Sequence, residues 1–141
     1  MANAKTASID DLIVRIGTGK QAPDARTALR AIPAAEVVPC LVRAFSDPRP
    51  KVRGAAYELS TSTPARARGT PLANVVAGLA DVDPGVRLSV LLALNRGWGN
   101  TNAAVYAPRR EEVRAGLAPR VDDPDKRVKS QAAIIWKRLG L

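Results

Sequence analysis

Few residues in this chain could carry catalysis. There is no histidine and a single cysteine, Cys40, so Ser–His or Cys–His nucleophilic catalysis, imidazole acid–base chemistry and histidine-ligated metal sites are excluded. One cysteine also excludes an intrachain disulfide and a cysteine-cluster zinc site. Cys40 follows Pro39 in an apolar stretch, which predicts a buried and inert thiol. We therefore expect neither a metal nor another cofactor.

The carboxylates show no arrangement that serves general acid–base catalysis. Most lie at predicted helix starts or turns, where capping explains them: Asp10, Asp11, Asp24, Asp47, Asp81, Asp83, Asp122 and Asp123. Asp81 and Asp83 could hold a cation, but the twelve-residue calcium-loop pattern is absent. The segment Gly17-Thr-Gly19-Lys20 follows a predicted helix rather than a strand, unlike a phosphate-binding loop. We therefore predict a protein that is not an enzyme.

The charge of the chain supports binding better than catalysis. The sequence has 22 basic and 13 acidic residues and a net charge of +9, which predicts an acidic partner. Most of the basic residues are arginines, whose guanidinium fork bonds two carboxylate or phosphate oxygens at once. A high-GC genome would also favour arginine over lysine, but it does not explain the net charge.

Three stretches of the sequence repeat one pattern. In each, an apolar helix leads to an Asp, a proline-containing turn, and a Val followed by a basic residue that opens a second helix. The segments are 41–59, 76–94 and 117–135, and their turns begin at Asp47, Asp81 and Asp123. The Val lies five residues after the Asp each time, and successive Val residues are 34 and 42 positions apart. Self-similarity at such spacings is typical of a solenoid. The apolar residues after each turn fall at helical spacing.

The repeat predicts four helix pairs in a single domain over residues 1–141. A degenerate first pair precedes the three clear ones, and the pairs cover about 8–32, 36–62, 71–97 and 110–140. Hydrophobic residues make up 46% and aromatics only 4%, so the core must be aliphatic. No segment approaches the ~18 consecutive apolar residues of a membrane span. Acids near the N-terminus replace the apolar run of a secretory signal, so we expect a cytoplasmic protein.

The turns of these pairs resemble a known family. Asp47-Pro-Arg-Pro-Lys-Val-Arg53 and Asp81-Val-Asp-Pro-Gly-Val-Arg87 are similar to the inter-helix turn of HEAT repeats, especially the short bacterial PBS-lyase-type kind. Asp123-Pro-Asp-Lys-Arg-Val-Lys129 has Lys in place of Arg, and the resemblance covers about 36–140. It implies an all-α fold, an α-solenoid of about four HEAT-like helical hairpins. It also implies an architectural ladder between the turn Asp and helix Arg residues Asp47, Arg53, Asp81, Arg87 and Asp123.

Two long links between pairs, residues 60–70 and 96–110, carry the first set of candidate binding residues. Both links join a second helix to the next first helix, so they emerge from one edge of a solenoid, and long loops are often functional. Tryptophan with nearby arginine suits stacking on a base or contact with a protein surface. The candidates are Arg66, Arg68, Trp98, Asn100, Tyr106, Arg109 and Arg110. The alternative is that Trp98 and Tyr106 fold back over the boundary between the third and fourth pairs, and that Arg66 and Arg68 are merely solvated.

Two further surfaces could take part in binding. Lys51, Arg87 and Lys129 lie near the starts of second helices, which line the concave face of a HEAT-like solenoid, and could form a positive groove. A solvated face without a partner explains them equally well. The run Ile134-Ile135-Trp136 makes the last helix unusually apolar for a terminal repeat. Either Trp136 packs between the helices, or this end docks onto a partner or a second copy as a homodimer.

We therefore predict a non-enzymatic interaction module that binds an acidic protein partner through its basic face and long links. The alternative is a nucleic-acid-binding protein that contacts the DNA backbone, since some HEAT-like proteins are DNA-base glycosylases. Their catalytic residues cannot be matched to positions here, and the chain lacks the interleaved aromatic residues of single-strand binders. The resemblance favours a protein partner, because HEAT-like folds most often bind proteins.

Overall fold

The chain is all-helical. The computed structural model describes residues 4–101 and 106–141, and this part of the chain contains no strand. The helices are α1 (Ala4–Thr18), α2 (Ala22–Arg30), α3 (Ala34–Ala44), α4 (Pro50–Ser60), α5 (Pro64–Gly69), α6 (Leu72–Ala77), α7 (Pro84–Thr101), α9 (Arg110–Leu117) and α10 (Lys126–Arg138). Short 3-10 turns are η1 (Gly78–Ala80), η2 (Ala107–Arg109) and η3 (Ala118–Asp122).

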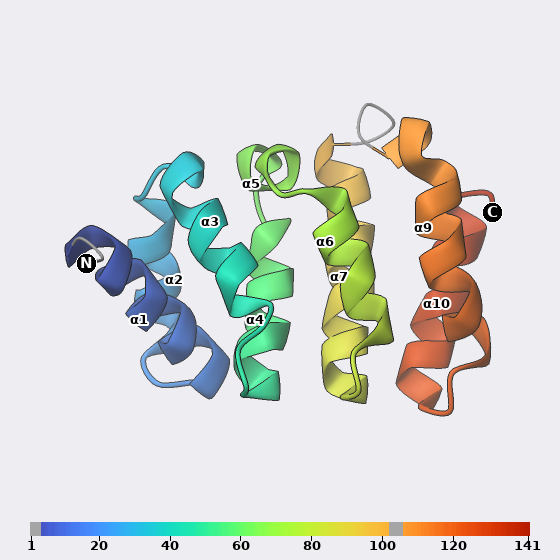
Figure 1. Cartoon of the computed structure of the whole chain (residues 1–141), viewed down its shortest axis with the longest axis horizontal. Coiled ribbons are helices and arrows are strands. Elements are labelled where there is room, and N and C mark those ends of the chain that lie inside the picture. Colours follow the sequence, from blue (N-terminus) through green and yellow to red (C-terminus); the bar gives the residue numbers. More distant parts are fainter. Residues whose placement is uncertain (1–3, 102–105) are drawn as a thin grey trace.

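The helices form a row of pairs that runs from the N-terminus to the C-terminus (Figure 1). Helices α1, α3, α6 and α9 lie in front, and α2, α4, α7 and α10 lie behind them. Helix α4 packs against α7 and α7 against α10, while α6 packs against α9 in the other layer. The turns within pairs lie at the lower edge of the view, whereas α5, which sequence reasoning missed, lies at the upper edge between α4 and α6.

An aliphatic core runs between the two layers, as the composition predicts. Most of the inward positions that helical spacing predicts in the second helices are buried: Val52, Ala56, Leu59, Val86, Val90, Ala93, Leu94, Val128, Ala132 and Ile135. Ala55 and Leu139, predicted by the same spacing, are only half-buried. First helices contribute Leu41 and Leu117, which are both fully buried. Burial of one aliphatic side chain contributes about 1.5–3 kcal/mol, so this shared seam is the main source of stability.

The first pair departs from the pattern of the others. Helix α1 packs against both α3 and α4, and α2 packs mainly on α1. The approach is so close that a Cβ atom on Gly17 would lie 2.8 Å from the Val52 Cα, so glycine is required there. Helix α1 also begins by Ala4, ahead of the predicted start near residue 8, and it ends at Thr18, before Gly19 with its positive φ of 80°. The first pair thus joins the row through helix packing, without the repeated turn of the later pairs.

The repeated Asp residues close the turns and do not cap the helices, which corrects the sequence prediction. Each carboxylate accepts the backbone N–H two residues further on, at 2.9 Å, in the pairs Asp47–Arg49, Asp81–Asp83 and Asp123–Asp125. In the last two turns the second acid caps the helix, since Asp83 accepts the Val86 N–H and Asp125 accepts the N–H groups of Arg127 and Val128. Helix α4 has no side-chain cap. The turn Asp therefore keeps carboxylate capacity for an arginine.

Candidate functional site

The predicted arginine ladder is present between successive helix pairs. Arg53 donates from Nε and Nη2 to the two carboxylate oxygens of Asp81, at 2.9 and 3.0 Å. Arg87 makes the same two contacts with Asp123, again at 2.9 and 3.0 Å. Each arginine also donates to the carbonyl oxygen of its own turn Asp, Asp47 or Asp81. The ladder therefore joins the second pair to the third and the third to the fourth. Asp47, also predicted as a member, instead pairs with Arg49 of its own turn.

The structure corrects the location predicted for Arg87. This side chain is buried in the ladder and does not lie on an open concave surface, so it is not available to a partner. Lys129 occupies the equivalent position in the last pair and is exposed. The same local sequence pattern thus gives a buried structural cation in one pair and an accessible one in the next.

The ladder predicts how stability depends on pH. Burial alone would raise the pKa of Asp81 and Asp123, but hydrogen bonds from Arg53 and Arg87 and from the turn N–H groups hold both values below the usual one. The pKa of each carboxylate is therefore lower in the folded chain than in the unfolded chain, where it is near 3.9. The stability that the two ion pairs contribute is complete above the unfolded pKa and is lost as pH falls through the folded pKa. We expect the free energy of unfolding from urea titrations to fall below about pH 4.

The variant Asp81→Asn tests the origin of that fall. The amide oxygen keeps the turn hydrogen bond to the backbone N–H of Asp83, while the group that titrates is removed. Asp81→Asn should therefore be less stable at neutral pH and should lose less stability on acidification. A slope against pH identical to that of the unmodified chain would show that the ladder does not cause the acid sensitivity.

The link between α4 and α6 does not present its arginines as predicted. Arg66 is 4% exposed, and its guanidinium donates to the Ser62 Oγ at 2.9 Å and to the Leu29 carbonyl at 3.2 Å. Burial, with the nearby charge of Arg30, lowers the pKa of Arg66. The side chain anchors α5 and cannot contact a partner. Arg68 is exposed, as predicted.

The aromatic residues of the second link also turn inward. Tyr106 is 4% exposed, and its ring centroid lies 5.7 Å from that of the half-buried Trp98. With Val113 and Leu139 they surround an apolar cavity of 50 Å³, and burial raises the pKa of the Tyr106 hydroxyl. This is the alternative that the sequence left open, in which the two rings cover the boundary between the last two pairs. Asn100 falls in the last turn of α7, and its side chain lies outside the described residues.

The cations that follow Tyr106 are exposed but engaged. Arg109 pairs with Glu112 at 2.5 Å, and Arg110 donates to the Gly140 carbonyl oxygen. The first contact stabilises the start of α9, and the second joins α9 to the C-terminal segment. The link edge therefore lacks the concentrated set of unpaired arginines that the sequence suggested.

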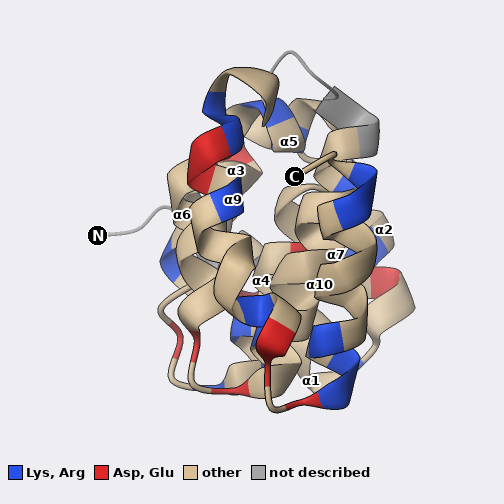
Figure 2. Cartoon of the chain, turned by 90° about the vertical axis from the view of Figure 1, so that its right-hand side faces the viewer, with Lys and Arg blue, Asp and Glu red and all other residues tan. Residues whose placement is uncertain are grey.

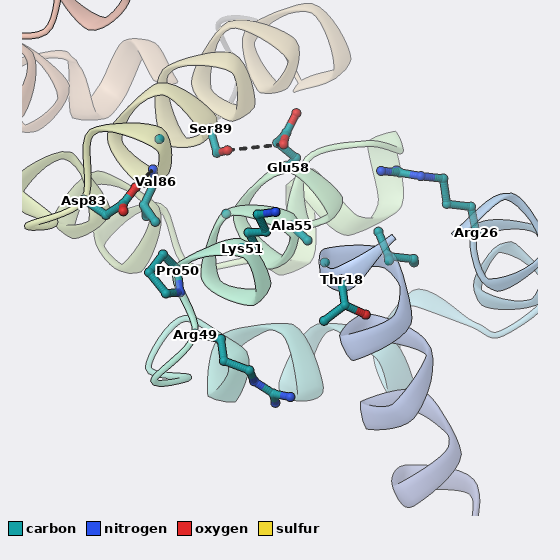
Figure 3. A pocket seen from close by; sticks show the side chains of 14 residues that line it. Thr18, Arg26, Arg49, Pro50, Lys51, Ala55, Glu58, Asp83, Val86 and Ser89 are labelled. Atoms are coloured by element: carbon teal, nitrogen blue, oxygen red, sulfur yellow. Dashed lines mark hydrogen bonds between the residues drawn. The ribbon is translucent and has the colours of Figure 1, made fainter. Parts of the chain in front are cut away.

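A groove of 720 Å³ lies on the face formed by α2, α4 and α7, and it includes the predicted residue Lys51 (Figure 3). Its walls are the end of α1, the side chain of Arg26 on α2, the turn residue Arg49 and the starts of α4 and α7. Small residues, Gly54 and Gly85 among them, keep it open where α4 meets α7. A second hollow of 650 Å³ shares Thr18 and Arg49 with it and adds Lys20.

The charges in this groove are of two kinds. Its carboxylates are used internally, since Ser89 Oγ donates to Glu58 at 3.2 Å and the Val86 N–H donates to Asp83 at 3.1 Å. Arg26 and Lys51 are exposed and have no ionic partner among the described side chains. Arg49 is held at the rim by Asp47, at 2.9 Å. The groove thus offers cations to a ligand, while its acids are already hydrogen-bonded.

Sequence reasoning found only one cation of this groove. Arg49 lies in the repeated turn, and this position could have identified it as a residue near Lys51. No sequence pattern marked Arg26 as a binding residue, because it lies in the first pair, where the repeat is degenerate. Arg26 reaches the groove from α2, and Figure 3 shows its side chain on the side of the groove away from Pro50 and Asp83.

Other chemistry receives no support in the described part of the chain. There, no three acidic or cysteine side chains cluster in a way that could hold a metal ion. Cys40 is buried, as predicted, and burial raises the pKa of its thiol. None of the described helices combines the length and the apolar character that a membrane crossing needs.

Comparisons of the chain with protein-family models, with curated proteins and with solved structures give no match.

Proposed function

We propose that the chain is a HEAT-like α-solenoid that acts as a cytoplasmic, non-enzymatic binding module. The regular ladder between pairs and the two-layer row of helices support the repeat interpretation. In this proposal the groove at Lys51 holds an acidic segment of a partner protein. The exposed, unpaired cations Arg26 and Lys51, on opposite walls of an open groove, are the observation that carries the proposal.

The charges of the groove favour a protein segment over a nucleic-acid backbone. Glu58 and Asp83 line the same groove as the cations, so a continuous row of phosphates would meet carboxylates as well. A peptide can place its acidic side chains at Arg26 and Lys51 and its backbone N–H groups near the two carboxylates. A flexible acidic peptide therefore fits this groove better than a rigid nucleic-acid backbone.

Charge reversal at the groove tests the proposal. We expect Arg26→Glu/Lys51→Glu to weaken binding of poly-L-glutamate by at least about tenfold at low salt, because like charges then face each other. The matched control is Arg30→Glu/Arg68→Glu, which makes the same change at exposed positions outside the groove. Fluorescence anisotropy of labelled polymer, measured over a salt series, gives both affinities.

Two outcomes would contradict the proposal. Equal weakening by the groove variant and its control would mean that only the net charge matters. Micromolar binding of random-sequence duplex DNA that falls steeply with salt and depends on Arg26 and Lys51 would favour the nucleic-acid alternative. Affinity capture with and without nuclease would then distinguish the two classes of natural partner.

A further inference from the structure

The arginine ladder is incomplete at its last position. Arg53 and Arg87 each lie six residues after a turn Asp, and each reaches the turn Asp of the following pair. Lys129 lies six residues after Asp123, and its exposed ammonium group has no carboxylate partner among the described residues. By the geometry of the two preceding pairs, Lys129 faces the place where a following helical element would put its carboxylate.

The outer face of α10 combines this cation with exposed apolar surface. Figure 2 looks onto this end of the row, where Lys and Arg lie at both ends of α10 and the middle of the helix is uncharged. Ile134 is 53% exposed in that middle stretch, beside the exposed Ala133 and Ser130. The cations of the face are Lys126, Arg127, Lys129 and Lys137. Ile134 by itself would be an ordinary exposed side chain, and it is its position beside Ala133 and the unpaired Lys129 that makes this face suited to a contact.

Next to this face, the junction between α9 and α10 is closely packed. Trp136 is half-buried, and the Arg114 guanidinium lies 5.6 Å from the centroid of its ring, which closes the junction between α9 and α10. Ile135 is fully buried on the opposite side of the helix. Trp136 therefore packs between the helices, one of the two predicted options, and the exposed part of the face is Ile134 with its basic surroundings.

We infer that the outer face of α10 docks an acidic helical segment of another protein, which places a carboxylate at Lys129 and an apolar side chain over Ile134. The proposal concerns a surface distinct from the groove and does not depend on it. The ion pairs of Arg53 and Arg87 in the ladder are the model for the contact that we expect at Lys129, an ion pair between two neighbouring helical elements. The partner must be acidic because the cations frame Ile134 at both ends of the helix.

Charge argues against two other occupants of this face. In a symmetric dimer, Lys126 and Lys129 of one copy would lie against the same cations of the other, which is unfavourable. In a head-to-tail contact, α2 would offer Asp24 but also Arg26 and Arg30. A nucleic-acid backbone would leave Ile134 without an apolar contact.

The test uses the whole chain and a synthetic helical peptide with leucine on one face and glutamate beside it. In ¹⁵N–¹H NMR titrations we expect the largest shift changes over residues 126–138. Lys129→Glu should weaken binding by about tenfold or more. Lys129→Arg should tighten it, because arginine restores the two-point contact made by Arg53 and Arg87. Ile134→Ser should weaken it without changing the salt dependence.

Controls separate this surface from the groove and from a second copy. Lys51→Glu makes the same charge change in the groove and should leave the α10 shifts unchanged. Shift changes centred on the groove, or equal weakening by Lys51→Glu and Lys129→Glu, would overturn the inference. So would weaker binding by Lys129→Arg. Reversible dimerisation in sedimentation experiments that Ile134→Ser abolishes would assign the face to a second copy instead.

Discussion

Replacing Arg87 with alanine should lower the free energy of unfolding by about 3 kcal/mol, close to the lower end of the cost of breaking a buried ion pair. The side chain of Asp123 is fully buried, so its carboxylate would lose two hydrogen bonds and could not recover them from water. Arg120, whose Nη1 lies 2.6 Å from Asp123, would still compensate part of the charge and keep the loss from being larger. Urea unfolding followed by circular dichroism measures the change.

Two matched variants show whether the buried charge is the cause. Arg127→Ala removes an exposed partner of Asp125 in the same turn and should leave the unfolding midpoint unchanged. Arg87→Met/Asp123→Asn removes both charges and keeps the turn hydrogen bond through the amide oxygen, so it should cost less than Arg87→Ala alone. If the double variant is the less stable of the two, the loss at Arg87 comes from packing rather than from an unpaired carboxylate.

Most of the helices could be predicted because they depend on local patterns, although the short helix α5 could not. A proline in the first turn and apolar residues at helical spacing specify α4 and α7 without knowledge of the rest of the fold. The pairing of Arg53 and Arg87 with the Asp of the following turn was an expectation from the resemblance of the turns to HEAT repeats, since the alignment of the three segments does not itself show which side chains meet. The first pair could not be predicted in the same way, because α1 packs on α4 through a close approach at Gly17 that no repeat records.

The candidate site was harder to predict, since accessibility depends on tertiary packing. Arg66 and Arg68 are two residues apart on a short helix, yet one anchors α5 in the interior and the other is exposed. Trp98 and Tyr106 have the composition of a contact surface, but they pack over the core. Residue type identified groups able to bind a partner, and only the arrangement of helices decided which ones face outward.

The use of arginine and lysine in this structure changes how the net charge is understood. The ion pairs of the ladder and of the turns all use an arginine, in accordance with its planar, two-point contact with carboxylates. Lys20, Lys51 and Lys129 are exposed, and none has a carboxylate partner in that part of the chain. The abundance of arginine thus has a structural explanation in the ladder and the turns, while much of the charge offered to a partner comes from lysine.

Replacing Tyr106 with alanine should lower the free energy of unfolding by about 3–5 kcal/mol, as for other buried aromatic side chains. The ring is almost fully buried against Trp98, and a Cβ atom on Gly97 would collide with its hydroxyl oxygen, so the two residues are closely fitted. Loss of the ring would extend the 50 Å³ cavity beside Val113 and Leu139. Chemical unfolding of Tyr106→Ala, compared with the exposed control Arg68→Ala, measures this cost.

The same variant decides between packing and binding at this link. If the rings serve a partner, Tyr106→Ala should keep the stability of the unmodified chain and lose affinity alone. The packing interpretation requires the opposite order, in which stability falls first and any loss of binding to poly-L-glutamate follows from unfolding. Measurement of affinity at a temperature where the variant is still folded separates these effects. Normal affinity there would establish that Tyr106 acts only by joining α7 to α9.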